Sequence, residues 1–204
     1  MVTAGKHHDL NLAKGTIMAK TSQSVTYGVP GLGSNDASEV AEILQDRLNT
    51  LNDLALTLKH IHWNVVGPHF IGVHTMLDPQ VDAVRLMVDD VAERIATLGG
   101  SPVGTPGALV ASRSWDDYSL GRDDALAHLG ALDIVYAGVI EAHRKAIEAT
   151  EELDPVTQDM LIEQAEQLEQ FHWFVRAHLE TPSGQLKTSG AHTETEAASK
   201  TRKK

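Results

Sequence analysis

The sequence contains no cysteine and few aromatic residues, and it has no long apolar run; each absence excludes a class of protein. Without cysteine there is no disulfide framework and no thiolate metal site, which fits a reducing cytoplasm. No stretch of about eighteen apolar residues and no apolar signal region is present, so we expect no membrane span and no membrane partner. There is also no Gly-rich phosphate loop and no HExxH helix. The 204 residues suit one domain with a sizeable core and terminal extensions.

The net charge of −11 is unevenly distributed along the chain. Residues 31–182 hold nine cationic and 25 acidic side chains, a balance of −16, whereas residues 1–30 carry +2 and residues 183–204 carry +3. Both ends are polar and poor in large apolar residues, so we expect a mobile basic tail at each end of the domain. These tails are either solubilising termini or contacts for an acidic partner. Their cations are Lys6, Lys14, Lys20, Lys187, Lys200, Arg202, Lys203 and Lys204, and all of them except Lys187 are the candidates for such a contact.

An apolar pattern with a period of seven residues runs through the middle of the chain. One row consists of Phe70, Leu77, Val84, Val91 and Leu98, and a second row consists of Val81, Val88 and Ile95. Two such rows predict one long amphipathic helix over about residues 70–98, with its apolar stripe facing a core. Extending the second row backwards by one heptad leads to His74, so a histidine replaces the expected apolar residue.

Carboxylates accompany this histidine at helical spacing. His74 and Asp78 are four residues apart, and so are Asp89 and Glu93. Each pair shares a helix face and is either a solvated contact or half of a metal site; imidazole with carboxylate suits iron or zinc. Asp78 and Asp89 point the same way but lie roughly 16 Å apart along the axis. One metal ion cannot reach both pairs on one helix, whereas a two-fold contact between two chains would join them twice.

His62 is the candidate for a further ligand. It continues the apolar stripe of the preceding helix, which is formed by Leu48, Leu51, Ala55 and Leu58. His60 points about 200° away from that stripe and is expected to be structural. A single histidine on an apolar face is often a satisfied core residue. A second inward histidine, His74, follows across the short Gly67-Pro68 break, and this favours the ligand interpretation.

The remaining pattern predicts an all-α protein with four long helices. The first helix starts with Asn35 or Asp36 as its cap and ends near Val65, and the second ends at Gly99-Gly100. A crossover at 101–118 contains one short helix near 108–112, and Trp115 and Tyr118 are expected to attach it to the bundle. The last two helices span about 122–152 and 155–180. A long connection between helices 2 and 3 is what a ferritin-like bundle requires.

The site residues also carry a family resemblance. The pattern His62-Trp63-Asn64-Val65-x-Gly67-x-x-Phe70-x-x-x-His74-x-x-x-Asp78, followed by Asp89-x-x-x-Glu93-Arg94, resembles the ferroxidase signature of the Dps family, the bacterial mini-ferritins. The resemblance extends over about residues 31–182. It implies a hollow dodecamer whose two-fold interfaces bind iron through His62, His74 and Asp78 of one chain with Asp89 and Glu93 of its neighbour. The helical spacing of the two pairs by itself leads to the same division between neighbouring chains.

The resemblance further implies a function. Fe(II) would be oxidised, with hydrogen peroxide as the preferred oxidant, and stored as Fe(III) mineral in a cytoplasmic, nucleoid-associated cage that protects DNA. Trp63 would take up stray oxidising equivalents, with core packing as its alternative role. Asp133 and Glu141 would line an iron-entry pore or be ordinary surface or interface carboxylates. The tails would bind DNA without regard to sequence.

Two other functions are compatible with parts of the sequence. One is a DNA-compacting architectural protein with secondary iron chemistry. The other is a ferritin with its di-iron site inside one bundle. That site needs a Glu-x-x-His motif on each of two helices, and only Glu169-x-x-His172 fits the pattern.

Overall fold

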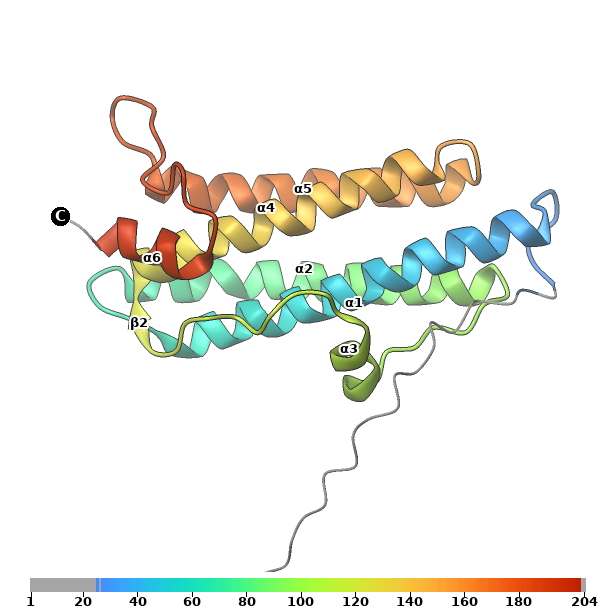
Figure 1. Cartoon of the computed structure of the whole chain (residues 1–204), viewed down its shortest axis with the longest axis horizontal. Coiled ribbons are helices and arrows are strands. Elements are labelled where there is room, and N and C mark those ends of the chain that lie inside the picture. The colour runs from blue at the N-terminus through green and yellow to red at the C-terminus, as the bar shows by residue number, and fades with distance from the viewer. Residues whose placement is uncertain (1–24, 26, 203–204) are drawn as a thin grey trace, which may run out of the picture.

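The computed structural model describes residues 25 and 27–202, and these residues are mostly helical (Figure 1). Four long helices form a bundle: α1 (Ser34–Asn64), α2 (Phe70–Thr97), α4 (Ala125–Thr150) and α5 (Pro155–Leu179). A short helix, α3 (Pro106–Ser112), lies in the crossover, and α6 (Glu194–Arg202) follows the bundle. Two short strands, β1 (Val65–Val66) and β2 (Asp123–Asp124), pair in parallel. The predicted all-α bundle with a short extra helix between helices 2 and 3 is confirmed.

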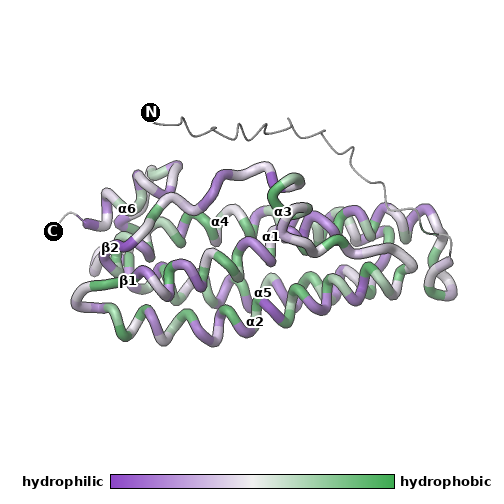
Figure 2. The backbone as a smooth tube through the Cα atoms, turned by 90° about the horizontal axis from the view of Figure 1, so that it is seen from below, coloured by the Kyte–Doolittle hydropathy of each residue, from purple (hydrophilic) through white to green (hydrophobic). Residues whose placement is uncertain are grey.

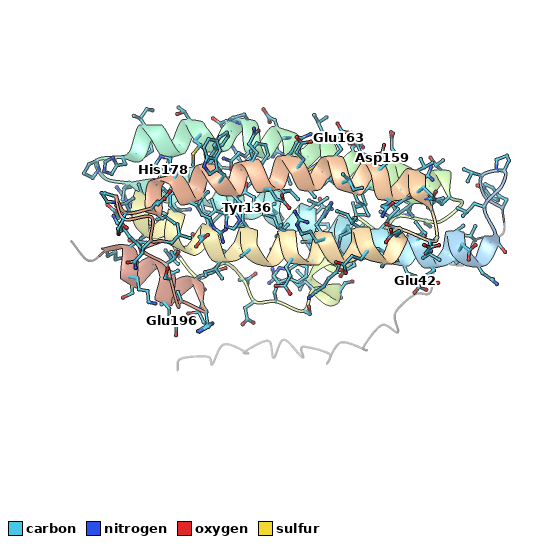
Figure 3. The ribbon with its side chains drawn as sticks, turned by 90° about the horizontal axis from the view of Figure 1, so that it is seen from above. Glu42, Tyr136, Asp159, Glu163, His178 and Glu196 are labelled. Atoms are coloured by element: carbon cyan, nitrogen blue, oxygen red, sulfur yellow. The ribbon has the colours of Figure 1, made fainter. Side chains whose placement is uncertain are left out.

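The core lies between two helix pairs, in which α1 packs along α2 and α4 along α5 (Figure 1). Apolar and polar residues alternate along each helix, as the hydropathy colouring of Figure 2 shows. On α2 the predicted rows are buried, except that Phe70, in the first turn, is 38% exposed and Val88 is only partly buried. Tyr136 points into the bundle (Figure 3), where its hydroxyl donates a hydrogen bond to Gln80 Oε1 over 2.7 Å. The large, fully buried aliphatic residues of α1 and α4 include Leu44, Leu48, Leu51, Leu54, Leu58, Ile61, Leu129 and Leu132.

α4 is, within the described part of the chain, the one helix whose length and composition would also suit a membrane span. More than half of its most apolar eighteen-residue window is buried against the rest of the protein. A core helix of a bundle has this property as well, because it is apolar over much of its circumference.

The crossover is attached to α1 by polar side chains. Asp53 accepts hydrogen bonds from Trp115 Nε1 at 2.9 Å and from Arg113 at 3.0 Å. Tyr118 packs against the core, and its hydroxyl oxygen lies 3.0 Å from His128 Nδ1. Trp115 and Tyr118 therefore both attach the crossover to the bundle, as predicted. His60 Nε2 donates to the carbonyl of Leu120 over 2.8 Å, which is the structural role expected for this histidine.

The helix ends agree with the sequence in part. α2 ends at Thr97, and Gly99 follows with a φ of +86°, a conformation that favours glycine, while Gly100 N donates to Ile95 O. α1 differs from expectation, because it starts at Ser34 after Gly33 and has no side-chain cap. The prediction that Asn35 or Asp36 caps it is therefore wrong.

The C-terminal segment differs more strongly from expectation. We expected residues 183–204 to form a mobile tail, but residues up to 202 fold back onto the bundle and end in α6. Ala197, Ala198 and Thr201 are buried in this contact. The composition of the segment does not predict this contact, because the contact is made by small residues that are equally common in polar tails. Residues 1–24, 26 and 203–204 lie outside the described residues.

Gly99 provides a test of how the N-terminal segment packs. A Cβ atom at this position would lie 1.9 Å from the carbonyl oxygen of Tyr27. We expect Gly99→Ala to lower the free energy of unfolding by about 1–3 kcal/mol, measured by urea denaturation, through this clash and the positive φ. Gly138→Ala is the control: it lies within α4 with no atom within 4 Å of its added Cβ. It should be neutral or stabilising by up to about 1 kcal/mol. Equal stability of the two variants would contradict the Tyr27 contact.

Candidate metal centre

His62 and His74 are brought together by the turn between α1 and α2. Their rings stack with centroids 3.6 Å apart and planes inclined by 22°. His62 Nδ1 lies 2.9 Å from the carbonyl oxygen of His74, and His74 Nδ1 lies 2.9 Å from the carbonyl oxygen of His62. Each histidine therefore holds the backbone of the other, and both rings are fixed relative to the two helices.

These reciprocal bonds determine which ring nitrogen carries the proton. A carbonyl oxygen only accepts, so each Nδ1 must be the donor. In the neutral imidazole the lone pair is then on Nε2, which is the form that binds a metal ion. Metal-binding histidines commonly donate their other N–H to a carbonyl or carboxylate, which orients the ring. His62 and His74 of one chain therefore have the ring orientation and tautomer that are common among metal-binding histidines.

Asp78 adds a carboxylate beside the two rings. Its Oδ1 lies 3.1 Å from Lys59 Nζ and 3.3 Å from His62 Nδ1, and its side chain is 49% exposed. The hydrogen bond from Lys59 is the main cause that lowers the pKa of Asp78; burial opposes it, and attraction from His62, Lys59 and His74 lowers the pKa further. The carboxylate is therefore ionised at neutral pH. Sequence reasoning missed Lys59, although its place three residues before His62 was a usable signal.

Asp89 and Glu93 lie further along α2, and both are exposed. Eleven residues of helix separate Asp78 from Asp89, which is roughly 16 Å along the axis. Within the described residues, no three His, Asp or Glu side chains are placed to hold a metal ion. The described residues of one chain therefore form no complete metal site: His62 lies against His74 and Asp78, and helix spacing keeps the Asp89/Glu93 pair apart from them.

Trp63 lies next to His62 but points away from the core. Its side chain is 72% exposed, and Lys59 Nζ is 5.9 Å from the centre of its ring. Core packing within the chain, the alternative role considered for this indole, is therefore ruled out by its exposure.

The two predicted pore residues have different environments. Asp133 is 5% exposed; its Oδ1 accepts from His172 Nε2 at 2.7 Å and Arg176 Nε at 2.9 Å, and its Oδ2 accepts from Thr188 at 2.6 Å. Burial raises the pKa of Asp133, but these hydrogen bonds outweigh it and lower the pKa to about 2. Glu141 is exposed and pairs with Lys145 one helical turn away. This arrangement favours the ordinary structural role for Asp133 over a pore lining.

The motif for a di-iron site within one bundle is engaged elsewhere. Glu169 forms an exposed ion pair with Arg144, and His172 is bonded to Asp133. The two side chains of this motif therefore have separate partners, Arg144 and Asp133.

Of the predicted DNA-binding cations, only Lys200 and Arg202 lie in the described part of the chain. Lys200 Nζ donates to the carbonyl of Ser189 over 2.6 Å, and Arg202 forms an ion pair with Asp123. The other five, Lys6, Lys14, Lys20, Lys203 and Lys204, lie outside it.

Known proteins are similar to this chain in fold and in sequence. The family model described as "Ferritin-like domain" matches residues 41–183. The "DNA protection during starvation protein" of Mycolicibacterium smegmatis is 62% identical over 179 residues, covering 88% of this chain and 98% of that protein. Among solved structures, DpsA14 from Streptomyces coelicolor is 62% identical with a TM-score of 0.80, covering 81% of this chain and 98% of that one. Mycobacterium smegmatis Dps is 62% identical with a TM-score of 0.81, covering 82% of this chain and 95% of that one.

The bundle and its crossover therefore define a ferritin-like protein. Within that class, the chain belongs to the Dps family, whose members act in DNA protection during starvation. The resemblance inferred from the histidine and carboxylate spacing is confirmed at the level of the family.

The Asp133 cluster generates a prediction on pH. Because the folded-state pKa is about 2 against an ordinary value of 3.8, the stabilisation is present above pH 3.8 and is lost as pH falls through 2. We expect Asp133→Asn to lower the free energy of unfolding by roughly 2 kcal/mol at pH 7. The difference from the wild type should narrow between about pH 4 and pH 2 in urea denaturation series. Glu141→Gln, at the exposed pair, is the control and should leave stability nearly unchanged at every pH. A difference that is independent of pH would contradict the ionised cluster.

Proposed function

We propose that this protein is a ferroxidase and an iron store, which oxidises Fe(II) at sites formed by two chains. The observation that carries the proposal is the His62–His74 pair, in which both rings have their Nδ1 proton fixed by a backbone carbonyl. Two prepared imidazole nitrogens with Asp78 form a partial ligand set for iron. Asp89 and Glu93 of a two-fold partner would complete it, because antiparallel copies of α2 bring the two groups together twice.

The donor set suits a reaction that changes the charge of the ion. Imidazole binds Fe(II) well, and carboxylates favour the harder Fe(III), so a mixed site tolerates both states. Hydrogen peroxide is the oxidant that the family resemblance suggests: two ferrous ions supply the two electrons, and two protons are taken up as one peroxide becomes two waters. Paired oxidation avoids a one-electron step that would release a hydroxyl radical. Trp63, exposed beside His62, is placed to accept a stray oxidising equivalent.

Assembly follows from the same proposal. A site that needs two chains requires at least a two-fold dimer, and the family resemblance extends this to a hollow dodecamer whose cavity holds the Fe(III) mineral. The interior of such a cage would be reached by iron and closed to DNA, which fits a cytoplasmic, nucleoid-associated protein.

Mixing two inactive variants tests the shared site. His74→Ala and Glu93→Ala should each abolish rapid Fe(II) oxidation, because each removes a ligand from every site. After co-assembly in equal amounts, each mixed pair restores one of its two sites, so about one site in four should recover under random pairing. Stopped-flow absorbance of Fe(III) formation after addition of peroxide is the measurement.

Asp90→Ala is the matched control, since Asp90 is an exposed carboxylate of α2 next to Asp89 but points about 100° away from it. This variant should oxidise Fe(II) at the wild-type rate. If the mixed assemblies regain no activity while the Asp90 variant is active, the two-chain site is wrong.

A second function, binding of DNA through the tails, is favoured by the charge distribution. Residues 31–182 carry −16, so a polyanion is repelled by the body and can be held only by segments that extend from it. A Debye length of about 8 Å at physiological salt shields an extended tail from that repulsion. Four cations lie among the last five residues, and no element that could read bases is visible in the sequence. Binding should therefore be independent of DNA sequence.

Deletion of residues 199–204 tests this role. We expect a large loss of DNA affinity and a shallower dependence of affinity on salt, because fewer phosphates lose their counterions, while Fe(II) oxidation is unchanged. Fluorescence anisotropy of a labelled duplex at several salt concentrations is the measurement. Replacement of Lys6, Lys14 and Lys20 by Gln is the parallel variant: a larger loss there than in the deletion would assign the role to the N-terminal segment.

A further inference from the structure

α6 lies across the first half of α4, at the same end of the bundle as the turn between α1 and α2 (Figure 1). The contact is made of small residues from both helices. On α6 the buried residues are Ala197, Ala198 and Thr201. On α4 they include Ala127, Gly130 and Ala131. Glu196 lies on the outer, exposed side of α6 (Figure 3).

Gly130 is the residue that allows the close approach. A Cβ atom at this position would lie 2.8 Å from Thr201 Cγ2, 2.9 Å from the carbonyl oxygen of Ala197 and 3.0 Å from Thr201 Oγ1. One of these atoms belongs to the backbone of α6, so the helix as a whole would have to move. α6 thus docks in this position only against glycine.

Polar contacts hold both ends of α6. At its start, Glu194 Oε2 accepts a hydrogen bond from the amide of Ser119 over 2.6 Å. At its end, Arg202 forms an ion pair with Asp123. Burial raises the pKa of Asp123, but the hydrogen bonds from Arg202 and from the backbone amide of Asp124 outweigh this effect and lower the pKa below its usual value. Lys200 donates to the carbonyl of Ser189. Two of the cations available for DNA are therefore engaged within the chain.

The docked helix is weakly held for its length. α6 has nine residues, which is too short for a stable isolated helix in water. It buries two alanines and one threonine, and the partly exposed ion pair at its end is of a kind that contributes little to stability. An element with so few apolar contacts belongs to the part of a protein that opens locally.

We propose that α6 is a latch, in which docking on α4 withholds Lys200 and Arg202 from DNA and release of the helix makes both cations available. This inference rests on the proposed binding of DNA by the C-terminal segment. A phosphate backbone competes with Asp123 for Arg202 and with the Ser189 carbonyl for Lys200. Binding therefore draws α6 off the bundle, and changes that weaken the α4–α6 contact strengthen binding.

Gly130→Ala opens the latch without altering any charge. We expect faster hydrogen exchange at the amides of 194–202 and several-fold tighter binding to a labelled duplex. The plot of log affinity against log salt should steepen by about 0.9 for each cation released. Gly138→Ala is the matched control, because it makes the same change in the same helix at an exposed position with no neighbouring atom within 4 Å. It should change neither exchange nor affinity.

In a second variant a disulfide tethers α6 to α4, so the helix cannot leave the bundle although a Cβ at position 130 shifts it slightly. The distance of 3.0 Å from a Cβ at position 130 to Thr201 Oγ1 is the separation of Cβ from the far sulfur in a disulfide of ordinary geometry. The chain has no other cysteine, so Gly130→Cys with Thr201→Cys can form only this bond within a chain. When oxidised, the variant should bind DNA more weakly than the wild type. When reduced, it should behave like Gly130→Ala, so the same protein serves as its own control.

The outcomes separate the latch from the function it rests on. If deletion of residues 199–204 leaves DNA binding unchanged, binding by the C-terminal segment is wrong and the latch falls with it. If the deletion weakens binding but Gly130→Ala frees α6 without increasing affinity, the latch alone is wrong. Equal affinity of the oxidised and reduced double-cysteine variant would also overturn it.

Discussion

The reciprocal bonding of His62 and His74 is the constraint on which the proposed chemistry depends. Each ring donates to the backbone of the other residue, so the two helices that carry them cannot shift relative to each other without breaking both bonds. The short turn at Gly67, whose φ is +92°, allows the chain to reverse between the two histidines. The same contact thus closes the α1–α2 hairpin and leaves both Nε2 atoms as acceptors. Folding of the hairpin and orientation of the two rings are therefore coupled.

The parts of the fold that the sequence predicts are those in which one residue type repeats at a regular spacing. The α2 row through Leu77, Val84 and Val91 is buried as predicted, since burial of an amphipathic stripe is read directly from its period. The separation of Asp78 from Asp89 is likewise a matter of helix geometry. Phe70 departs from its row because it stands in the first turn of α2, where neighbouring elements no longer cover the stripe.

The parts that the sequence does not predict depend on contacts between distant segments or between small residues. Asp133 looked like a lone charge on an apolar helix, and nothing local shows that His172, Arg176 and Thr188 converge on it. α6 looked like a polar tail because its buried residues are two alanines and a threonine. A usable signal was the matching stripe of small residues on α4, where Gly130 lies inside the helix at some cost in helix propensity. Lys59 was missed for the same reason as the Asp133 contacts, since its partner Asp78 is on another helix.

Asp133 and Asp123 attach the C-terminal segment to the bundle at two points of different strength. Asp133 anchors Thr188, and Asp123 anchors Arg202, so two carboxylates of the acidic body hold the segment at positions fourteen residues apart. The first anchor is buried and has three donors, so it is strong and little affected by salt; the second is partly exposed, so ions screen it. The segment is therefore expected to open from its C-terminal end, with Thr188 as the fixed point. Salt then acts on both sides of the competition, since it loosens the Asp123–Arg202 pair and also weakens contacts to phosphate. The contacts to phosphate involve several cations and lose affinity more steeply, so rising salt favours an open segment that is not bound to DNA.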